Sequence, residues 1–142
     1  MTQADILAAV QSALADKAAL EIIGHGSKRR IGNLPATAKT LDLSSLTGIN
    51  FYEPEELVLS AKAGTPIAEI EALLASKGQQ LAFEPMDYGP LLGGNAGQGT
   101  IGGILATNTS GPRRLKAGAA RDHVLGIEAV SGRGEMFKSG GD

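Results

Sequence analysis

The sequence contains no cysteine and no tryptophan, and aromatic residues make up only 4% of its 142 residues. Without cysteine, disulfides, thiolate metal sites and cysteine nucleophiles are excluded. Thirteen basic and fifteen acidic residues give a formal net charge of -2, so no basic excess marks a nucleic-acid surface. No apolar run reaches the length of a membrane span, and the N-terminus lacks the basic segment that begins a signal peptide. We therefore expect a cytoplasmic domain that reaches a membrane, if at all, through a partner protein.

Glycine is the residue that the sequence has in excess, with 20 copies, about twice the usual share. Ten of the 20 glycines lie in two stretches, residues 24–32 (the first glycine segment) and residues 93–111 (the second glycine segment). Backbone without side chains can lie close to a ligand, so this clustering points to binding rather than to a loop-rich fold.

Periodicity and turn residues predict the elements around these segments. Thr2 and Asp5 resemble a capping box at the start of a helix that ends near Lys17. A second helix begins with Thr65 as N-cap and Pro66 at the first position, and it ends at Gly78. Strands are expected at residues 20–23, 39–43, 49–52, 57–63, 80–83, 122–130 and 135–138, with a hairpin turn at residues 132–134 before the last of them. Residues 104–108 form a short helix or strand. Residues 84–103 show no regular pattern, and a loop of that length in a small domain is usually functional.

The first glycine segment, Gly24-His25-Gly26-Ser27-Lys28-Arg29-Arg30-Ile31-Gly32, directly follows an expected strand. Successive backbone N–H groups in such a loop can form an anion nest, and the Ser27 hydroxyl and the basic residues add to it, as a pyrophosphate requires. The segment lacks the Gly-Lys-Ser/Thr ending of the NTPase phosphate loop. Arg29 stands where the Rossmann pattern needs glycine, and Asn33-Leu34-Pro35 argues against a following helix. A basic surface turn is the alternative interpretation.

The second glycine segment contains Gly93-Gly94-Asn95-Ala96-Gly97-Gln98-Gly99-Thr100-Ile101-Gly102-Gly103, against which a planar ligand could lie. Gly97, Gly99 and Gly102 also match the Rossmann spacing, and Asp122 follows at about the distance of a ribose-binding acid. The Rossmann pattern requires a preceding strand, and residues 90–95 do not predict one. A Rossmann-type nucleotide-binding module is therefore the weaker alternative.

Four motifs in this order resemble the FAD-binding domain of the vanillyl-alcohol oxidase and p-cresol methylhydroxylase (PCMH-type) superfamily. They are Ile23-Gly24-His25-Gly26-Ser27-Lys28, Val58-Leu59-Ser60-Ala61-Lys62-Ala63-Gly64-Thr65-Pro66, Thr100-Ile101-Gly102-Gly103 with Asn108 and Gly111, and Asp122-His123-Val124-Leu125-Gly126-Ile127-Glu128-Ala129-Val130. Within the superfamily, the Gly-Ser-Lys ending and residues 107–114 resemble the FAD-binding subunits of bacterial glycolate oxidases.

The resemblance implies an α+β fold of two lobes that clasp FAD, the first at about residues 1–46 and the second at about residues 48–142. It places Gly24, His25, Gly26, Ser27 and Lys28 against the pyrophosphate. It places Thr100, Ile101, Gly102 and Gly103 near the flavin and pyrophosphate, with Ser110 and Gly111 close by and Ile127 on the adenine side.

Two departures from the family pattern shape these expectations. Some relatives tether FAD through a histidine at the position of Ser27, so the resemblance implies FAD bound without a covalent link. Members of the family continue beyond the position of Asp142, so it also implies a truncated domain whose catalytic residues lie outside the chain. No metal is expected, His123 is expected to be structural, and the basic residues Arg113, Arg114, Lys116 and Arg121 form either a solvated face or a docking surface.

The implied function is that of the FAD-binding subunit of an oxidase or dehydrogenase of 2-hydroxy acids such as glycolate. Its partners would be other oxidase subunits, including an iron–sulfur subunit, with no nucleic acid and no membrane span of its own. The alternative within the same resemblance is a non-catalytic flavin or assembly module of a heteromeric oxidase.

Overall fold

The computed structural model describes residues 1–33, 36–37 and 39–141. Leu34 and Pro35, which the sequence marks as unfavourable for a helix, lie outside the described residues. In chain order the elements are α1 (Gln3–Ala15), β1 (Leu20–Ile23), β2 (Lys39–Asp42), β3 (Ile49–Glu53), β4 (Val58–Ala61), α2 (Ile67–Ala75), the 3-10 helix η1 (Pro90–Leu92), α3 (Ile101–Thr107), α4 (Arg114–Ala117), the 3-10 helix η2 (Ala120–His123), β5 (Gly126–Val130) and β6 (Met136–Gly140). This mixture confirms the expected α+β class, whereas the lobe boundary near residue 47 stays a prediction.

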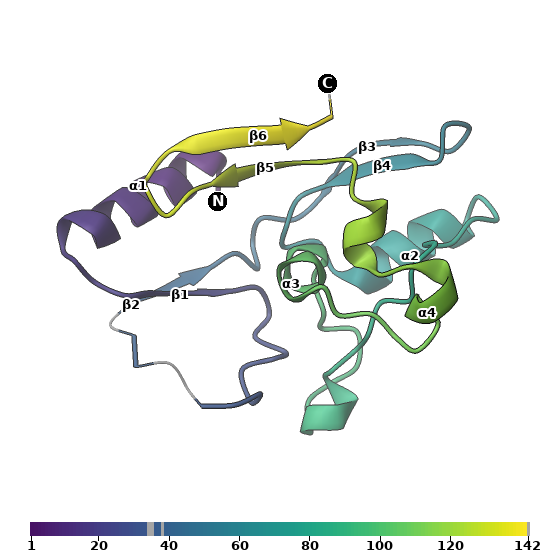
Figure 1. Ribbon diagram of the computed structural model, residues 1–142, viewed down its shortest axis with the longest axis horizontal. Coiled ribbons are helices and arrows are strands. Elements are labelled where there is room, and N and C mark those ends of the chain that lie inside the picture. The colour runs from purple at the N-terminus through teal and green to yellow at the C-terminus, as the bar shows by residue number, and fades with distance from the viewer. Residues whose placement is uncertain (34–35, 38, 142) are drawn as a thin grey trace.

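The described strands pair two by two. In Figure 1 the pairs β5–β6 and β3–β4 lie along the top of the molecule, and β1–β2 lies below them on the left. β1 and β2 are parallel, with Leu20 opposite Lys39 and Ile23 opposite Asp42. β3 and β4 form an antiparallel hairpin, and so do β5 and β6. Helix α1 packs against β2 and β5 and so joins the N-terminal strands to the C-terminal hairpin. β1 ends at Ile23, and the first glycine segment begins at the next residue.

The N-terminal helix begins as the sequence predicts. The Thr2 hydroxyl accepts a hydrogen bond from the Asp5 N–H at 3.3 Å, and the Asp5 carboxylate accepts one from the Thr2 N–H at 2.7 Å. This capping box satisfies two N–H groups that the first turn leaves without a partner in the helix. The helix ends at Ala15, two residues before the predicted end.

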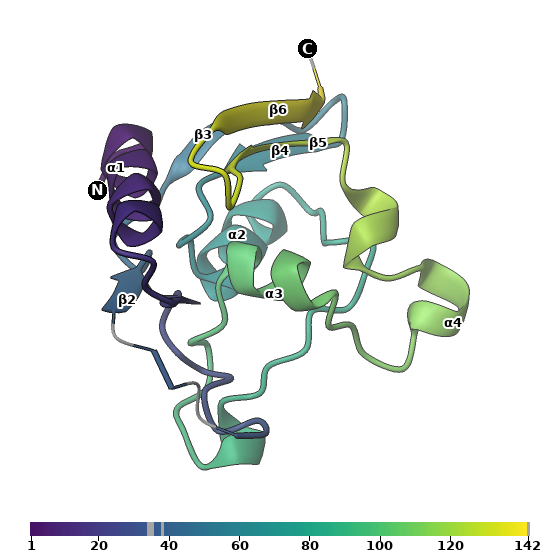
Figure 2. The ribbon, with the colours of Figure 1, turned by 60° about the vertical axis from the view of Figure 1, so that its left-hand side comes forward.

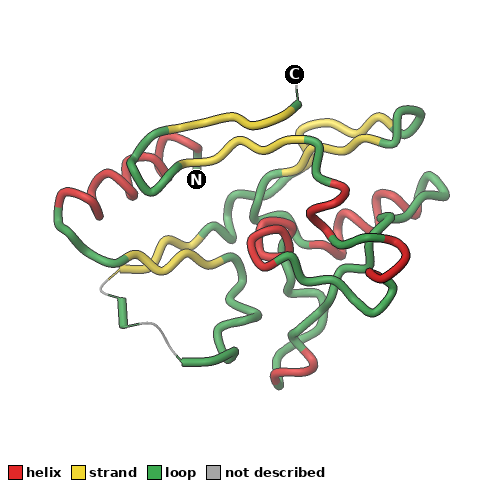
Figure 3. Tube along the Cα trace, viewed as in Figure 1, coloured by secondary structure: helices red, strands yellow, loops and turns green. Residues whose placement is uncertain are grey.

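The core lies between α2, α3 and η2, and α2 and α3 occupy the centre of Figure 2. Ile67 of α2, Ile104 of α3 and Ala120 of η2 form it together with Phe83, and all four side chains are buried. This core holds the start of α3 in place, because residues 101 and 104 pack on the same cluster. Much of the rest of the described chain is loop, above all at residues 24–33 and between α2 and α3 (Figure 3).

The start of α2 differs from the prediction. Pro66, not Thr65, occupies the N-cap position, and no side chain caps the helix. Thr65 is fully buried, and its hydroxyl donates to the Gly48 carbonyl at 3.2 Å and accepts from the Gly48 N–H at 3.0 Å. The hydroxyl is thus used in tertiary structure, which local sequence does not reveal.

Two predicted strands are wrong in whole or in part. Residues 80–83 form no strand; Leu81 and Phe83 alternate because both pack on the core. The strand predicted at residues 122–130 begins only at Gly126, because Asp122 accepts a hydrogen bond from the Ala119 N–H at 2.8 Å and belongs to η2. His123 therefore lies in a 3-10 helix, where its Nε2 is 2.8 Å from the Ala117 carbonyl oxygen. That contact agrees with a structural role.

Residues 104–108 belong to a helix that begins earlier, at Ile101, and whose C-cap is Asn108. The predicted turn at residues 132–134 does join β5 to β6.

Among the described residues, no helix combines the length and the apolar character needed to cross a membrane.

Candidate functional site

The first glycine segment leaves β1 and curls back on itself in two tight turns. The Arg29 N–H donates to the Gly26 carbonyl at 3.1 Å, and the Ile31 N–H donates to the Lys28 carbonyl at 3.0 Å. Among the described residues, none accepts a hydrogen bond from the backbone N–H of His25, Gly26, Ser27 or Lys28. Four successive donors are thus free of internal partners, which is the property that an anion nest requires.

These donors line a groove of about 250 Å³ that runs between the first glycine segment and α3. Its walls come from β1 and the first glycine segment on one side and from α3 on the other. The lining residues are Glu21, Ile22, Ile23, Gly24, His25, Gly26, Ser27, Lys28, Arg29, Thr100, Gly103, Ala106 and Thr107. The groove therefore brings together the five predicted residues of the first segment with Thr100 and Gly103 of the second.

The N–H groups at the start of α3 are already engaged. The Ile101 N–H donates to the Thr65 carbonyl at 3.0 Å, the Gly102 N–H to the Ala63 carbonyl at 2.8 Å, and the Gly103 N–H to the Thr100 hydroxyl at 3.2 Å. These bonds fix α3 on the chain segment that follows β4. Thr100 and Gly103 thus form part of a wall of the groove, whereas the free backbone donors belong to the first glycine segment.

Gly24 and Thr100 are in direct contact where the two glycine segments meet. A Cβ at position 24 would lie 2.7 Å from the Thr100 hydroxyl oxygen and 3.0 Å from its methyl carbon. Thr100 is 4% exposed and caps α3, so it has no room to move aside. Glycine is consequently the residue that this contact permits at position 24.

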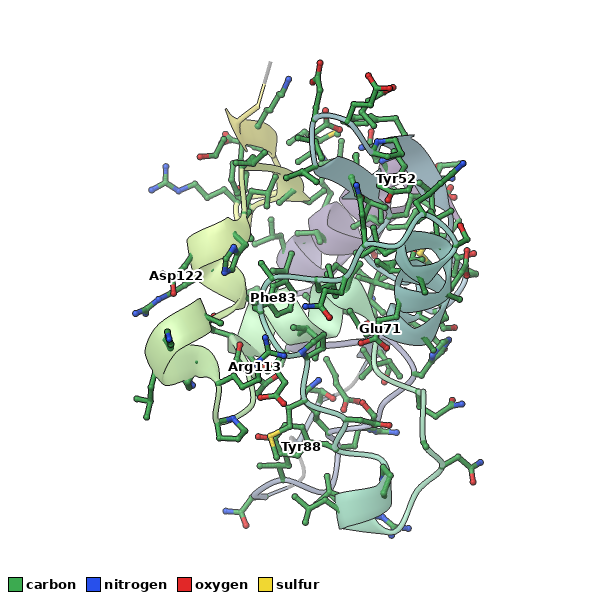
Figure 4. All side chains as sticks on the ribbon, turned by 90° about the vertical axis from the view of Figure 1, so that its right-hand side faces the viewer. Tyr52, Glu71, Phe83, Tyr88, Arg113 and Asp122 are labelled. Atoms are coloured by element: carbon green, nitrogen blue, oxygen red, sulfur yellow. The ribbon has the colours of Figure 1, made fainter. Side chains whose placement is uncertain are left out.

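Side chains of the first glycine segment also reach across to residues 88–98. His25 Nδ1 lies 3.2 Å from the Gln98 carbonyl oxygen, and Arg30 Nη1 donates to the Leu92 carbonyl at 3.0 Å. The Lys28 ammonium lies 5.8 Å from the centre of the Tyr88 ring. Figure 4 shows Tyr88 in the lower part of the molecule, at the opposite end from Tyr52 of β3. The two glycine-rich parts of the chain are thereby joined at several points.

Lys28 supplies the positive charge of the groove. Its side chain is half-buried, and burial lowers its pKa below the ordinary value of 10.5, while the charge of Asp87 acts in the opposite direction. Among the described residues it forms no ion pair. A half-buried ammonium without a carboxylate partner is a favourable neighbour for an anionic ligand.

Asp87 organises the loop of residues 87–97. Its two carboxylate oxygens accept hydrogen bonds from the Gly89 N–H at 2.9 Å and from the Gly97 N–H at 2.8 Å. The loop between these residues contains η1 and closes on itself through this side chain. A smaller cavity of about 70 Å³, lined in part by Asp87, Glu71 and Gly99, lies next to it.

Five predicted site residues do not line the groove. The Ser110 hydroxyl accepts a hydrogen bond from the Ala120 N–H at 3.1 Å, and the Gly111 N–H donates to the Glu84 carbonyl at 2.9 Å. Ile127 pairs with Ser139 in the C-terminal hairpin. Ile101 and Gly102 lie at the start of α3 but do not line the groove. Of the predicted cofactor-binding residues, the groove thus contains those of the first glycine segment together with Thr100 and Gly103, and the others lie outside its lining.

Several groove residues were not expected from the sequence. Ala106 and Thr107 lie one turn after Gly103 on α3, a spacing that a helix prediction beginning at Thr100 would have revealed. Glu21 and Ile22 belong to β1, the strand before the first glycine segment.

The basic cluster expected from the sequence lies in and around α4 and η2 and consists of Arg113, Arg114, Lys116 and Arg121. Arg121 pairs with Asp122 at 3.7 Å.

The Rossmann alternative does not hold for either glycine segment. The element before Gly97 is the 3-10 helix η1 and not a strand, and β1 runs into turns rather than into a helix opened by the glycines. The structure therefore lacks, in its described part, the strand–turn–helix context that the motif requires.

Comparison with known proteins gives a consistent picture. The family model described as "FAD binding domain" matches residues 1–140. The glycolate oxidase subunit GlcE of Escherichia coli is 42% identical over 137 residues, which cover 96% of this chain and 37% of that protein. The D-lactate dehydrogenase of Archaeoglobus fulgidus is 48% identical over 42 residues, 30% of this chain and 10% of that protein.

The solved structure of alkyldihydroxyacetonephosphate synthase is similar with a TM-score of 0.73 at 20% identity, covering 97% of this chain and 25% of that one. This likeness shows the PCMH-type fold. The chain spans about a third or less of the length of these relatives. A family match over nearly the whole chain, together with this fold, leads to one conclusion: the chain belongs to the FAD binding domain family, and its cofactor is FAD.

Proposed function

We propose that residues 24–28 hold the pyrophosphate of FAD without a covalent link. The observation that carries this proposal is the run of four free backbone N–H groups beside the half-buried Lys28 ammonium. A pyrophosphate offers oxygen acceptors and negative charge, and both donor types are present in the groove. The Ser27 hydroxyl adds a further donor, and Ser27 stands where some relatives carry the tethering histidine.

The proposed site continues along Thr100, Ile101, Gly102 and Gly103, which support the flavin as a wall rather than through free backbone donors. Ser110, Gly111 and Ile127 complete it in this proposal, with Ile127 on the adenine side. These three residues lie outside the groove, and an extended dinucleotide is long enough to pass beyond a groove of this size. In this proposal the first glycine segment binds the pyrophosphate, and the residues from Thr100 onward contact the rest of the FAD molecule.

We further propose that the protein is the FAD-binding subunit of an oxidase or dehydrogenase of 2-hydroxy acids such as glycolate. The similarity to a glycolate oxidase subunit over 96% of the chain supports this activity, as does the shorter similarity to a D-lactate dehydrogenase. In such a reaction the 2-hydroxy acid loses two electrons and two protons to become a 2-oxo acid, and bound flavin supplies the two-electron acceptor. Electrons would then pass to other subunits, among them an iron–sulfur subunit, through which the enzyme would associate with a membrane.

The purified protein tests the first part directly. We expect a flavin absorbance spectrum, or an increase in melting temperature when FAD is added to the colourless protein. A protein that is folded by circular dichroism but shows neither response would overturn the proposed site. Reduction of the bound flavin by glycolate under anaerobic conditions, measured on the protein assembled with its partner subunits, tests the activity. Flavin that binds in this assembly but is never reduced by 2-hydroxy acids would favour a non-catalytic flavin module.

A further inference from the structure

We infer that Glu21 and Arg29 form a brace that sets both the shape and the charge of the groove. Glu21 is then a positioning residue for the cofactor and not one of its ligands. The inference rests on the proposed function, because it concerns how the first glycine segment is held ready for the pyrophosphate. Both side chains line the groove, and neither belongs to the four motifs that carry the family resemblance.

Glu21 is fixed by the parallel strands below the groove. It lies on β1 directly opposite Thr40 of β2, and the Thr40 hydroxyl donates to Glu21 Oε2 at 3.2 Å. The Glu21 side chain is only 10% exposed. A carboxylate that is so far removed from water requires compensating donors, and β2 provides one of them.

Arg29 provides the other two donors. Its Nε donates to Glu21 Oε1 at 3.0 Å and its Nη2 to Glu21 Oε2 at 2.9 Å. Two parallel bonds between a planar guanidinium and a carboxylate fix the direction of the arginine as well as its distance. Since Arg29 follows Glu21 by eight residues, this pair closes the chain between them into a ring that contains all four free backbone donors.

Gly26 shows that the arginine stem is part of this arrangement. Its φ is +69°, and a Cβ there would lie 3.2 Å from Arg29 Cδ. The Arg29 N–H in turn donates to the Gly26 carbonyl at 3.1 Å. The arginine stem therefore covers Gly26 on one side, which holds the turn closed and leaves the N–H groups of residues 25–28 without internal partners.

The brace also determines the sign of the charge that a ligand meets. Glu21 and Arg29 neutralise each other, so the net positive charge of the groove comes from Lys28. If Arg29 is removed, the Glu21 carboxylate stays in the wall without its two strongest donors and repels a diphosphate. If both are removed, the repulsion disappears together with the brace.

The single and double variants should therefore differ in FAD affinity in a direction that can be stated in advance. The dissociation constant for FAD is measured by flavin fluorescence for wild-type protein, Arg29→Ala, Glu21→Ala, the double variant and Arg29→Lys, each verified to be folded by circular dichroism. We expect Arg29→Ala to weaken binding at least tenfold and the double variant to bind more tightly than Arg29→Ala. Arg29→Lys keeps the charge but not the planar fork, so it should also weaken binding. Losses that simply add, or wild-type affinity in Arg29→Lys, would overturn the inference.

A matched control and a second measurement separate this inference from the proposed function. Arg133→Ala removes an arginine from the turn between β5 and β6 and should leave the dissociation constant unchanged. The N–H groups of residues 29 and 31 donate to the carbonyls of Gly26 and Lys28, and in protein without FAD their hydrogen exchange should become faster in Arg29→Ala and stay unchanged in Arg133→Ala. If wild-type protein does not bind FAD, the proposed site fails. If it binds FAD but exchange and affinity are insensitive to Arg29, only the brace fails.

Discussion

A Cβ at Gly24 would lie 2.7 Å from the hydroxyl oxygen of Thr100, so the two glycine segments touch at a point where no side chain fits between them. The same hydroxyl accepts a hydrogen bond from the Gly103 N–H and caps α3. Any change at position 24 is therefore transmitted to the opposite wall of the groove. The first predictions test this contact and the loop beside it.

Replacing Gly24 with alanine should damage both stability and binding. The added methyl forces Thr100 out of its capping position or pushes the first glycine segment away, and overpacking of this kind costs about 1–3 kcal/mol. We expect a lower midpoint of urea unfolding and at least a tenfold weaker FAD affinity. Gly132→Ala is the matched control, because no atom lies within 4 Å of a Cβ at that position. Equal behaviour of the two variants would show that the contact with Thr100 is not restrictive.

Asp87→Ala should loosen the loop of residues 87–97. The substitution leaves two N–H donors, those of Gly89 and Gly97, without their acceptor. A hydrogen bond to a charged group contributes at most about 1.5–3 kcal/mol to the free energy of unfolding. Asp87→Asn retains one oxygen acceptor and should have a smaller effect. Hydrogen exchange at Gly97 measures the change directly, and Glu55→Ala in the exposed turn after β3 is the control. Unchanged protection at Gly97 would contradict this role of Asp87.

The described fold and groove show where sequence reasoning succeeds. The capping box of α1 and the turn at residues 132–134 are local devices, and both lie where the sequence predicts them. The strand predicted at residues 80–83 fails because alternation alone does not distinguish a strand from a loop whose side chains pack on a core. The groove was predicted on its glycine side, since glycine clusters are visible in sequence. Glu21 and Asp87 could not be found in this way, because their partners are eight and ten residues away and are defined only by the folded backbone.

FAD should be released when the protein is denatured. Ser27 cannot form the histidyl link that some relatives have at this position, and His25 Nδ1 is engaged with the Gln98 carbonyl. After acid precipitation we expect the yellow colour in the supernatant and an unmodified mass for the protein. Colour that remains in the pellet, with added mass on a peptide containing His25, would show that a covalent link forms at a different position.

Lys28→Met should have opposite effects on stability and on FAD binding. The direction of the stability change follows from the pKa of Lys28. Burial lowers this pKa in the folded protein below the value of 10.5 that it has when unfolded, so the unfolded state binds more protons between the two values. Without FAD, the free energy of unfolding of the wild type therefore contains a penalty that is fully present below the lowered pKa and is relieved as the pH rises toward 10.5.

Lys28→Met lacks this penalty and should be more stable than the wild type at neutral pH in the absence of FAD. The difference should shrink as the pH rises and vanish above pH 10.5, as measured by urea unfolding at several pH values. The same variant should bind FAD roughly tenfold or more weakly, because a charge-assisted bond to the pyrophosphate is lost. Its affinity should also depend less on salt, since one ionic contact is missing. A variant that is less stable at neutral pH, or one that binds FAD as tightly as the wild type, would show that the Lys28 ammonium is held by its own surroundings rather than kept available for an anion.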